Sequence, residues 1–256
     1  MADTAFWAER VRRYGHTGWS DFATYWYDQR LRLKAIEQTV LGDLPRGRHS
    51  ALDFGCGVGD FCTALAPHFR HVIGYDVSAD VLELARRRNA GPHIAYSSQL
   101  DNALAGPHDL ILSVTVLQHI VDDAELSRLL ARFAQALAAG GRVVVLETLA
   151  EASSNAGYLK RRTLPQLTGL FMAAGLALVS ARGFYHPTES PTPAYRRYRS
   201  RFSVRVLGRL AGLKLPLAEA VLRGVARRHA EQDRAFLDQP ASPTKILVFG
   251  RKDELG

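Results

Sequence analysis

The stretch Leu52-Asp-Phe-Gly-Cys-Gly-Val-Gly-Asp60 decides how this chain folds. It ends a short apolar run and places glycines at alternate positions, so the backbone can turn tightly and a ligand can approach it closely. A helical pattern begins at Asp60, and the N-terminus of a helix favours negative charge. The stretch therefore predicts a strand, a ligand-binding turn and a helix, in that order.

An acid after the next apolar run extends this prediction. Asp76 follows His71–Tyr75, about 20 residues beyond the glycine turn, where a carboxylate can accept hydrogen bonds from both ribose hydroxyls of a nucleoside. A turn without a ligand is the alternative. Two features favour S-adenosylmethionine over a dinucleotide: the glycine spacing is not G-x-G-x-x-G, and Asp53 and Asp60 flank the turn. Carboxylates oppose a pyrophosphate but suit a cationic sulfonium and an ammonium group.

The alternation of apolar runs and helical patterns predicts the fold class. Between residues 49 and 184, short runs of consecutive apolar residues alternate with helical patterns, and a last apolar run lies at 245–249. This pattern predicts an α/β fold, a doubly wound and mostly parallel sheet with helices on both faces. We expect a helical cap at 1–48, a core at 49–184 and 244–256, and a basic helical insertion or lid at 185–243.

Several segments together resemble the class I S-adenosylmethionine-dependent methyltransferases of the small-molecule type. The resemblance rests on Asp53–Gly59, Val72–Ser78, His108–Ile120, Gly140–Leu146 and Ala174–Val179. It implies a Rossmann-like, seven-stranded sheet whose last strand is antiparallel, with S-adenosyl-L-methionine as cofactor and S-adenosyl-L-homocysteine as product.

The resemblance also implies which residues bind the cofactor. Ser98, Gln99 and Leu100 fall near the adenine by position, although the acid that often follows the third strand in this family is absent. The expected cofactor-binding residues are Asp53, Gly55, Cys56, Gly57, Asp76, Val77, Ser98, Gln99, Leu100, Ser113 and Val114.

Methyl transfer is an in-line displacement, so the protein has to position an acceptor and remove its proton. His119 lies a few residues after the fourth strand and titrates in the useful range, which makes it the expected general base; a helix-capping role is the alternative. Some relatives that bind a divalent metal carry E-x-x-E-H here. This chain has Thr115-Val-Leu-Gln118-His119, so we expect no metal.

The acceptor side of the site is expected where aromatic residues concentrate near the N-terminus. These residues either form a lid over the donor and acceptor or simply cap the core. Glu147 ends the fifth strand and is expected to face the mouth of the site, and Tyr195 begins an arginine-rich segment of the insertion. The expected substrate-binding residues are Tyr14, His16, Trp19, Tyr27, Glu147 and Tyr195.

The positive charge of the chain is local. The 256 residues carry 33 Lys and Arg against 25 Asp and Glu, a net charge of +8, and residues 185–243 hold 11 basic and 5 acidic side chains, net +6. This segment is a solvated arginine-rich cover, a binding site for an acidic substrate, an RNA-binding patch or a dimer contact. The fourth strand lacks the Asn/Asp-Pro-Pro-Tyr-like stretch of amino-methylating nucleic-acid enzymes, so a nucleic-acid partner is not favoured.

These observations predict methyl transfer to an O, N or C atom of a small molecule, a specialised metabolite with an acidic or polar group. The alternatives are an RNA, protein or peptide methyltransferase and a non-catalytic S-adenosylmethionine-binding protein. Two cysteines, no signal peptide and no membrane-length apolar stretch predict a cytoplasmic protein with no membrane partner, and a homodimer is possible.

Overall fold

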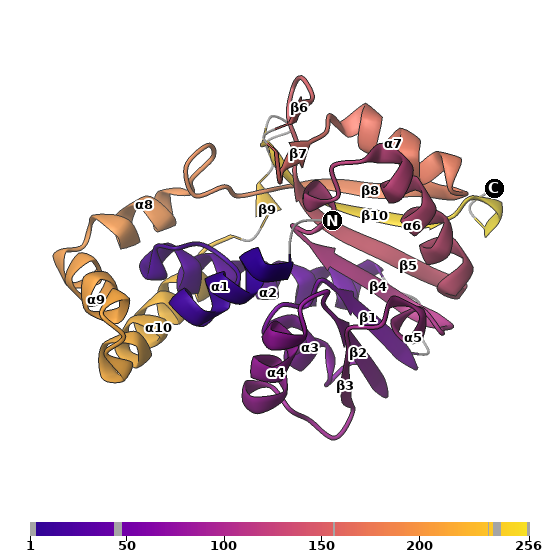
Figure 1. The fold of residues 1–256 in the computed structure, drawn as a ribbon. Helices are drawn as coiled ribbons and strands as arrows, with labels where there is room; N and C mark the ends of the chain where they lie inside the picture. The colour runs from indigo at the N-terminus through magenta and orange to yellow at the C-terminus, as the bar shows by residue number, and fades with distance from the viewer. Residues whose placement is uncertain (1–3, 44–47, 156, 235, 238–241, 255–256) are drawn as a thin grey trace.

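The computed structural model describes residues 4–43, 48–155, 157–234, 236–237 and 242–254. Residues 44–47, near the end of the expected cap, and the chain ends at 1–3 and 255–256 lie outside these residues. One large sheet forms the centre of the molecule (Figure 1). Its strands, in spatial order, are β3 (Ile94–Ser97), β2 (His71–Tyr75), β1 (Ser50–Phe54), β4 (His108–Val114), β5 (Leu137–Thr148), β10 (Thr244–Arg251), β8 (Leu176–Phe184) and β9 (Phe236–Leu237).

The strand pairing confirms the predicted sheet. Strands β3, β2, β1, β4 and β5 pair in parallel, whereas β10 pairs antiparallel with both β5 and β8. The short strand β9 was not predicted; it pairs antiparallel with the end of β8. Because β1 lies between β2 and β4, the strand order reverses there, and ligands of such sheets bind outside the carboxyl ends of the strands at this reversal.

Helices cover the sheet and extend beyond it (Figure 1). The α-helices are α1 (Thr4–Tyr14), α2 (Phe22–Asp43), α3 (Asp60–Leu65), α4 (Ala79–Arg88), α5 (Leu100–Ala103), α6 (Asp123–Ala136), α7 (Leu164–Ala173), α8 (Pro193–Ser200), α9 (Phe202–Gly212) and α10 (Pro216–Glu231). Short 3-10 turns lie at η1 (Leu117–His119) and η2 (Lys252–Glu254), and β6 (Ser154–Asn155) pairs with β7 (Lys160–Arg161) in a separate hairpin.

The core consists of two layers, one on each face of the sheet. Side chains of a strand point alternately to opposite faces, so Val144 and Val145 belong to different clusters. The cluster with Val145 includes the apolar sides of α6 and α7. The cluster with Val144 includes residues of α2, α3 and α8–α10. Helix α2 therefore lies on this face of the sheet, and α8–α10 pack against α2.

The N-terminal helices and the insertion pack as one helical cap. The Tyr27 hydroxyl of α2 donates a hydrogen bond to Asp233 at 2.6 Å, just beyond α10. Thr24 and Tyr195 share a hydrogen bond of 2.9 Å between α2 and α8, and the Tyr198 hydroxyl donates to the carbonyl of Ala23 at 3.0 Å. These contacts join segments that lie more than 170 positions apart in the sequence. They hold the two ends of the chain together in the cap.

Candidate active site

The glycine turn after β1 adopts a backbone that requires glycine. Gly55, Gly57 and Gly59 have φ angles of +78°, +53° and +86°, which L side chains rarely adopt. A Cβ atom at Gly55 would collide with the side chain of Val116, and one at Gly57 would lie 2.8 Å from the hydroxyl of Thr17. The turn therefore packs tightly between the exit of β4 and the N-terminal segment.

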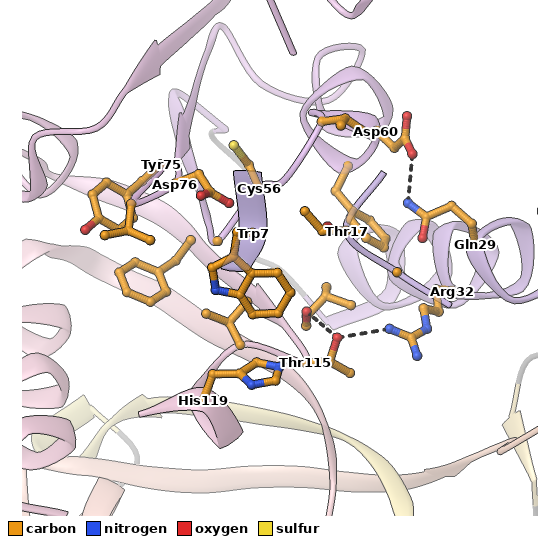
Figure 2. A pocket seen from close by; sticks show the side chains of 18 of the residues that line it. Trp7, Thr17, Gln29, Arg32, Cys56, Asp60, Tyr75, Asp76, Thr115 and His119 are labelled. Carbon is orange, nitrogen blue, oxygen red and sulfur yellow. Dashed lines mark hydrogen bonds between the residues drawn. The ribbon is translucent and has the colours of Figure 1, made fainter. Parts of the chain in front are cut away.

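A cavity lies at this turn, at the carboxyl ends of β1, β2 and β4 (Figure 2). The core contributes Phe54, Gly55, Cys56, Val58, Asp60, Phe61, Tyr75, Asp76, Val77, Val114, Thr115, Val116, His119 and Ile120. The N-terminal segment contributes Trp7, Thr17, Gly18, Tyr25, Gln29 and Arg32. Of the predicted site residues, the structure thus brings together Gly55, Cys56, Asp76, Val77, Val114 and His119.

Asp76 is held in one orientation at the wall of the cavity. One carboxylate oxygen accepts a hydrogen bond from the backbone N–H of Gly57 at 3.1 Å, and the other accepts from the N–H of Ser78 at 3.0 Å. Burial raises the pKa of Asp76, while the two N–H donors oppose that shift. Gly57 does not line the cavity, but it orients the acid that does.

A second, mostly apolar cavity adjoins the first. Both are lined by Phe54, Tyr75 and Ile120. The second adds Leu100 and, from α6, Leu129 and the charged residues Glu125, Arg128 and Arg132. Leu100 therefore lies where a ring system of a ligand bound in the first cavity would enter the second. Neither cavity is lined by Ser98, Gln99 or Ser113, and Ser113 is fully buried in the sheet.

The two acids that flank the glycine turn have different surroundings. Asp53 is buried and accepts a hydrogen bond from the Cys62 thiol at 3.2 Å, and burial raises its pKa to about 7. It does not line the cavity. Asp60 does, and it accepts hydrogen bonds from Tyr25 and Gln29, each at 3.1 Å. The carboxylate of Asp60 thereby fastens α2 to the start of α3.

His119 lies in the short turn η1 after β4, between two aromatic side chains. Its ring meets Trp7 edge-on at 4.9 Å and stacks on Tyr158 at 5.9 Å. Nδ1 lies 3.1 Å from the backbone carbonyl oxygen of Tyr158. Since a carbonyl only accepts hydrogen bonds, the neutral ring carries its proton on Nδ1 and leaves the lone pair on Nε2. Burial lowers the pKa of His119, which favours this neutral form.

Arg32 and Thr115 form a polar wall opposite the glycine turn. Thr115 follows β4 with a φ of +56°, accepts a hydrogen bond from Arg32 at 3.1 Å and donates one to the carbonyl of Val114 at 2.7 Å. The Arg32 guanidinium also pairs with Asp28 at 2.8 Å, and Asp28 accepts from the Trp19 indole at 2.8 Å. Trp19 thus supports the wall from behind and does not line the cavity.

The remaining predicted aromatic residues pack inside the cap. The ring of His16 stacks on Tyr25 at 3.4 Å, and burial lowers the pKa of His16 to about 3. Tyr14 packs against His16, while Tyr27 and Tyr195 make the hydrogen bonds that join the two halves of the cap. None of the four lines the cavity, because these rings are used to bury apolar surface between helices. Tyr25, from the same stretch of sequence, does line the cavity.

Glu147 lies behind the site, whereas the sequence placed it at the mouth. Its buried carboxylate accepts backbone hydrogen bonds from Val116 at 3.0 Å and Leu117 at 2.8 Å. Burial raises the pKa of Glu147 to about 7. The side chain turns inward because the start of η1 has free N–H groups that need an acceptor. Glu147 therefore holds the turn that carries His119.

Sequence reasoning missed several residues of the lining. Trp7, Thr17, Gln29, Arg32 and Thr115 all line the cavity. Thr115 could have been predicted, because the sequence places it directly after the fourth strand. Nothing in the local pattern of the two N-terminal helices, or of the segment that joins them, distinguishes the others from solvated or core residues. Within the part of the chain that the structure describes, no group of three His, Cys, Asp or Glu residues is placed to hold a metal, and no helix is long and apolar enough to cross a membrane.

Comparisons with known proteins agree with this geometry. A 35% identical stretch of 97 residues relates the chain to a dTDP-3-amino-3,6-dideoxy-alpha-D-glucopyranose N,N-dimethyltransferase of Streptomyces fradiae, over 38% of each protein. A ubiquinone biosynthesis O-methyltransferase of Chelativorans sp. is 32% identical over 128 residues, 45% of this chain and 49% of that protein. The chain thus matches half or less of the length of these curated relatives.

A solved structure and a family model extend the comparison. The structure of an S-adenosylmethionine-dependent methyltransferase from Clostridium acetobutylicum superposes with a TM-score of 0.53 at 12% identity, over 88% of this chain and 92% of that one. This likeness shows a shared fold. A family model described as a methyltransferase domain matches residues 25–188, which is more than half of the chain. The chain therefore belongs to this family of methyltransferase domains, as its glycine turn and Asp76 predicted.

Proposed function

We propose that this protein transfers a methyl group from S-adenosylmethionine to a small, polar acceptor molecule. The observation that carries the proposal is the cavity at the strand reversal, where the glycine turn and the carboxylate of Asp76 face the same space. A buried acid fixed beside glycine backbone is suited to the two hydroxyls of a ribose.

The residues present fit the methyl donor. Asp76 is the proposed ribose ligand, Gly55 and Cys56 border the space for the amino-acid part, and Leu100 borders the apolar cavity where an adenine would fit. Val77 and Val114 complete the walls of the first cavity. When bound, the cofactor supplies an electrophilic methyl group on a sulfonium. The chain itself has to orient the acceptor and take up its proton.

His119 is the proposed proton acceptor. It lines the same cavity, and its neutral ring has a free lone pair on Nε2. Trp7 and Tyr158 hold the ring from two sides and limit its movement. Glu147 positions His119 by fixing the N–H groups at the start of its turn.

The lining of the cavity favours an acceptor with hydroxyl or amine groups. Gln29, Arg32 and Thr115 provide hydrogen-bonding groups opposite the glycine turn. Because Arg32 is already paired with Asp28, this wall offers hydrogen bonds more than net positive charge. By their names, the two curated relatives methylate an amino sugar and a ubiquinone precursor, which are small molecules with such groups.

The proposal is tested in two steps. Calorimetric titration with S-adenosylhomocysteine should show one site per chain. Incubation with S-adenosylmethionine and a panel of amino sugars and dihydroxyphenols should then release S-adenosylhomocysteine with at least one acceptor, and His119→Gln should slow that release. Absence of S-adenosylhomocysteine binding overturns the cofactor assignment. Binding without release for any small acceptor, with release for RNA or protein, overturns the acceptor class.

A further inference from the structure

The turn between α9 and α10 exposes apolar side chains that the proposed methyl transfer does not use. Leu213 and Leu217 on either side of this turn are 71% and 78% exposed, and Leu215 between them is 46% exposed. Val221 lies one helical turn further along α10 and is 45% exposed. The hairpin forms the end of the cap that lies away from the sheet (Figure 1).

Helix α10 carries two apolar stripes, of which the fold buries one. The buried stripe recurs every four residues and packs within the cap; it consists of Ala218, Leu222, Ala226 and Ala230. The exposed stripe follows helical spacing on the other side; it consists of Leu217, Ala220, Val221 and Gly224. A surface helix in a globular protein normally carries one apolar stripe, so the second indicates a binding surface.

Positive charge surrounds the exposed stripe. Residues 201–231 hold seven basic and two acidic side chains, net +5, and one of the acids, Glu231, is paired with Arg30. Lys214 lies between the exposed leucines of the turn. Arg209 and Arg228 are exposed on the two helices, and Arg228 continues the exposed stripe of α10 at helical spacing. The surface is therefore both apolar and cationic.

This combination decides between the possible occupants. In a two-fold contact between copies of the chain the same surface meets itself, which would bring these cations together with few acids to neutralise them. A nucleic acid would use the arginines but not the leucines at the turn. An anionic lipid surface uses both, since leucines enter the boundary of the acyl chains while cations meet the phosphates.

We propose that the α9–α10 hairpin binds the surface of anionic lipid bilayers. The leucines of the turn enter the interface, and the flanking arginines and Lys214 remain at the level of the headgroups. The sequence lacks a membrane-length apolar stretch, and for that reason we expected no membrane partner. Binding at the surface of a bilayer does not require such a stretch. The proposal is independent of the proposed methyl transfer.

Vesicle co-sedimentation tests the proposal. The wild type should bind vesicles of phosphatidylcholine with 30% phosphatidylglycerol at least tenfold more tightly than pure phosphatidylcholine vesicles, and added salt should weaken this binding. Leu213→Ser/Leu217→Ser, which keeps the charge, should weaken binding at least tenfold. Arg209→Gln/Arg228→Gln should remove most of the preference for anionic lipid. The matched control is Met172→Ser/Val179→Ser, since these side chains are 46% and 44% exposed on α7 and β8, and it should bind as the wild type does.

Three results would overturn the proposal. The first is wild type that stays in the supernatant with anionic vesicles. The second is a leucine variant that binds as tightly as the wild type while its thermal melting is unchanged. The third is a wild-type dimer in light scattering that the leucine variant converts to a monomer, which would assign the surface to a second copy. S-adenosylhomocysteine titration of the same variants, expected to be unchanged, keeps this outcome separate from that of the proposed function.

Discussion

The carboxylate of Asp76 accepts a hydrogen bond of 3.1 Å from the backbone N–H of Gly57. This contact joins the two sequence features that predicted the family, 19 positions apart in the chain. The glycine turn thus does more than let a ligand approach: it also holds the acid that is proposed to bind the ribose. The loss of either residue should therefore weaken cofactor binding.

Asp76→Asn should weaken S-adenosylhomocysteine binding by about 10- to 100-fold. Hydrogen bonds to a charged group contribute roughly 1.5–3 kcal/mol, and the amide keeps the shape but loses the charge. Calorimetry measures the change. The matched control is Asp109→Asn, because Asp109 also accepts two backbone hydrogen bonds, from His49 and Ser50, but at the opposite end of the sheet. An affinity of Asp76→Asn within twofold of the wild type would contradict the ribose assignment.

Gly55→Ala should abolish measurable S-adenosylhomocysteine binding and lower the melting temperature. The added Cβ would collide with Val116 in a backbone of positive φ, so the turn between β1 and α3 has to move. Gly169→Ala in α7 is the control, since no atom lies within 4 Å of its added Cβ. That change should stabilise the helix by about 0.5–1 kcal/mol and leave binding unchanged. If Gly55→Ala bound S-adenosylhomocysteine as tightly as Gly169→Ala and melted at the same temperature, the turn would not be constrained as described.

His119→Gln should lower kcat by about 100-fold or more while leaving the affinity for S-adenosylhomocysteine within about twofold, as expected for a general base. Burial lowers the pKa of His119, so the wild type should keep its activity on acidification through the usual range of a histidine and lose it only below that range. This loss of activity at low pH, which results from protonation of His119, should be absent from the pH–rate profile of the variant. The control His93→Gln replaces an exposed histidine before β3. Wild-type turnover in His119→Gln would exclude a role in proton transfer.

The glycine turn and Asp76 at the cavity could be predicted because their placement depends on local sequence. Strand, glycine turn and helix follow one another within Leu52–Leu65, and Asp76 directly follows the neighbouring strand β2, so parallel pairing alone brings them to one edge of the sheet. The acceptor side could not. Arg32 reaches Thr115 across 83 positions, and this contact exists only because α2 packs on the sheet. The periodicity of α2 predicts its buried side but not which of its polar residues meets the exit of β4.

The aromatic residues illustrate the same limit. Their concentration near the N-terminus left two alternatives, a lid over the site and a cap on the core. In the structure the hydroxyl of Tyr27 completes a hydrogen bond to Asp233 within the cap, and Tyr195 of the insertion shares one with Thr24. A residue's type does not show whether it closes a cavity or fills the layer behind it. That distinction depends on the orientation of α2, which the insertion fixes from the far end of the chain.

Glu147→Gln should stabilise the protein more at pH 8 than at pH 5. The folded-state pKa of Glu147 is about 7, above its ordinary value of 4.5, so the folded chain binds the proton more tightly than the unfolded chain. The stability contributed by Glu147 is therefore fully present below pH 4.5 and is lost as the pH rises towards 7, by roughly 3 kcal/mol. Glutamine does not titrate, and its side-chain oxygen can still accept from Val116 and Leu117.

Thermal melting of the two proteins at pH 5 and pH 8 measures this effect. The melting temperature of the variant minus that of the wild type should rise by several degrees between the two values, because about 1 kcal/mol corresponds to roughly 2–4 °C at this size. Glu83→Gln, at a position 65% exposed on α4, should show no such trend. A constant difference across the two pH values would mean that Glu147 stays ionised in the fold. In that case the N–H groups of the His119 turn, and not burial, would dominate its environment.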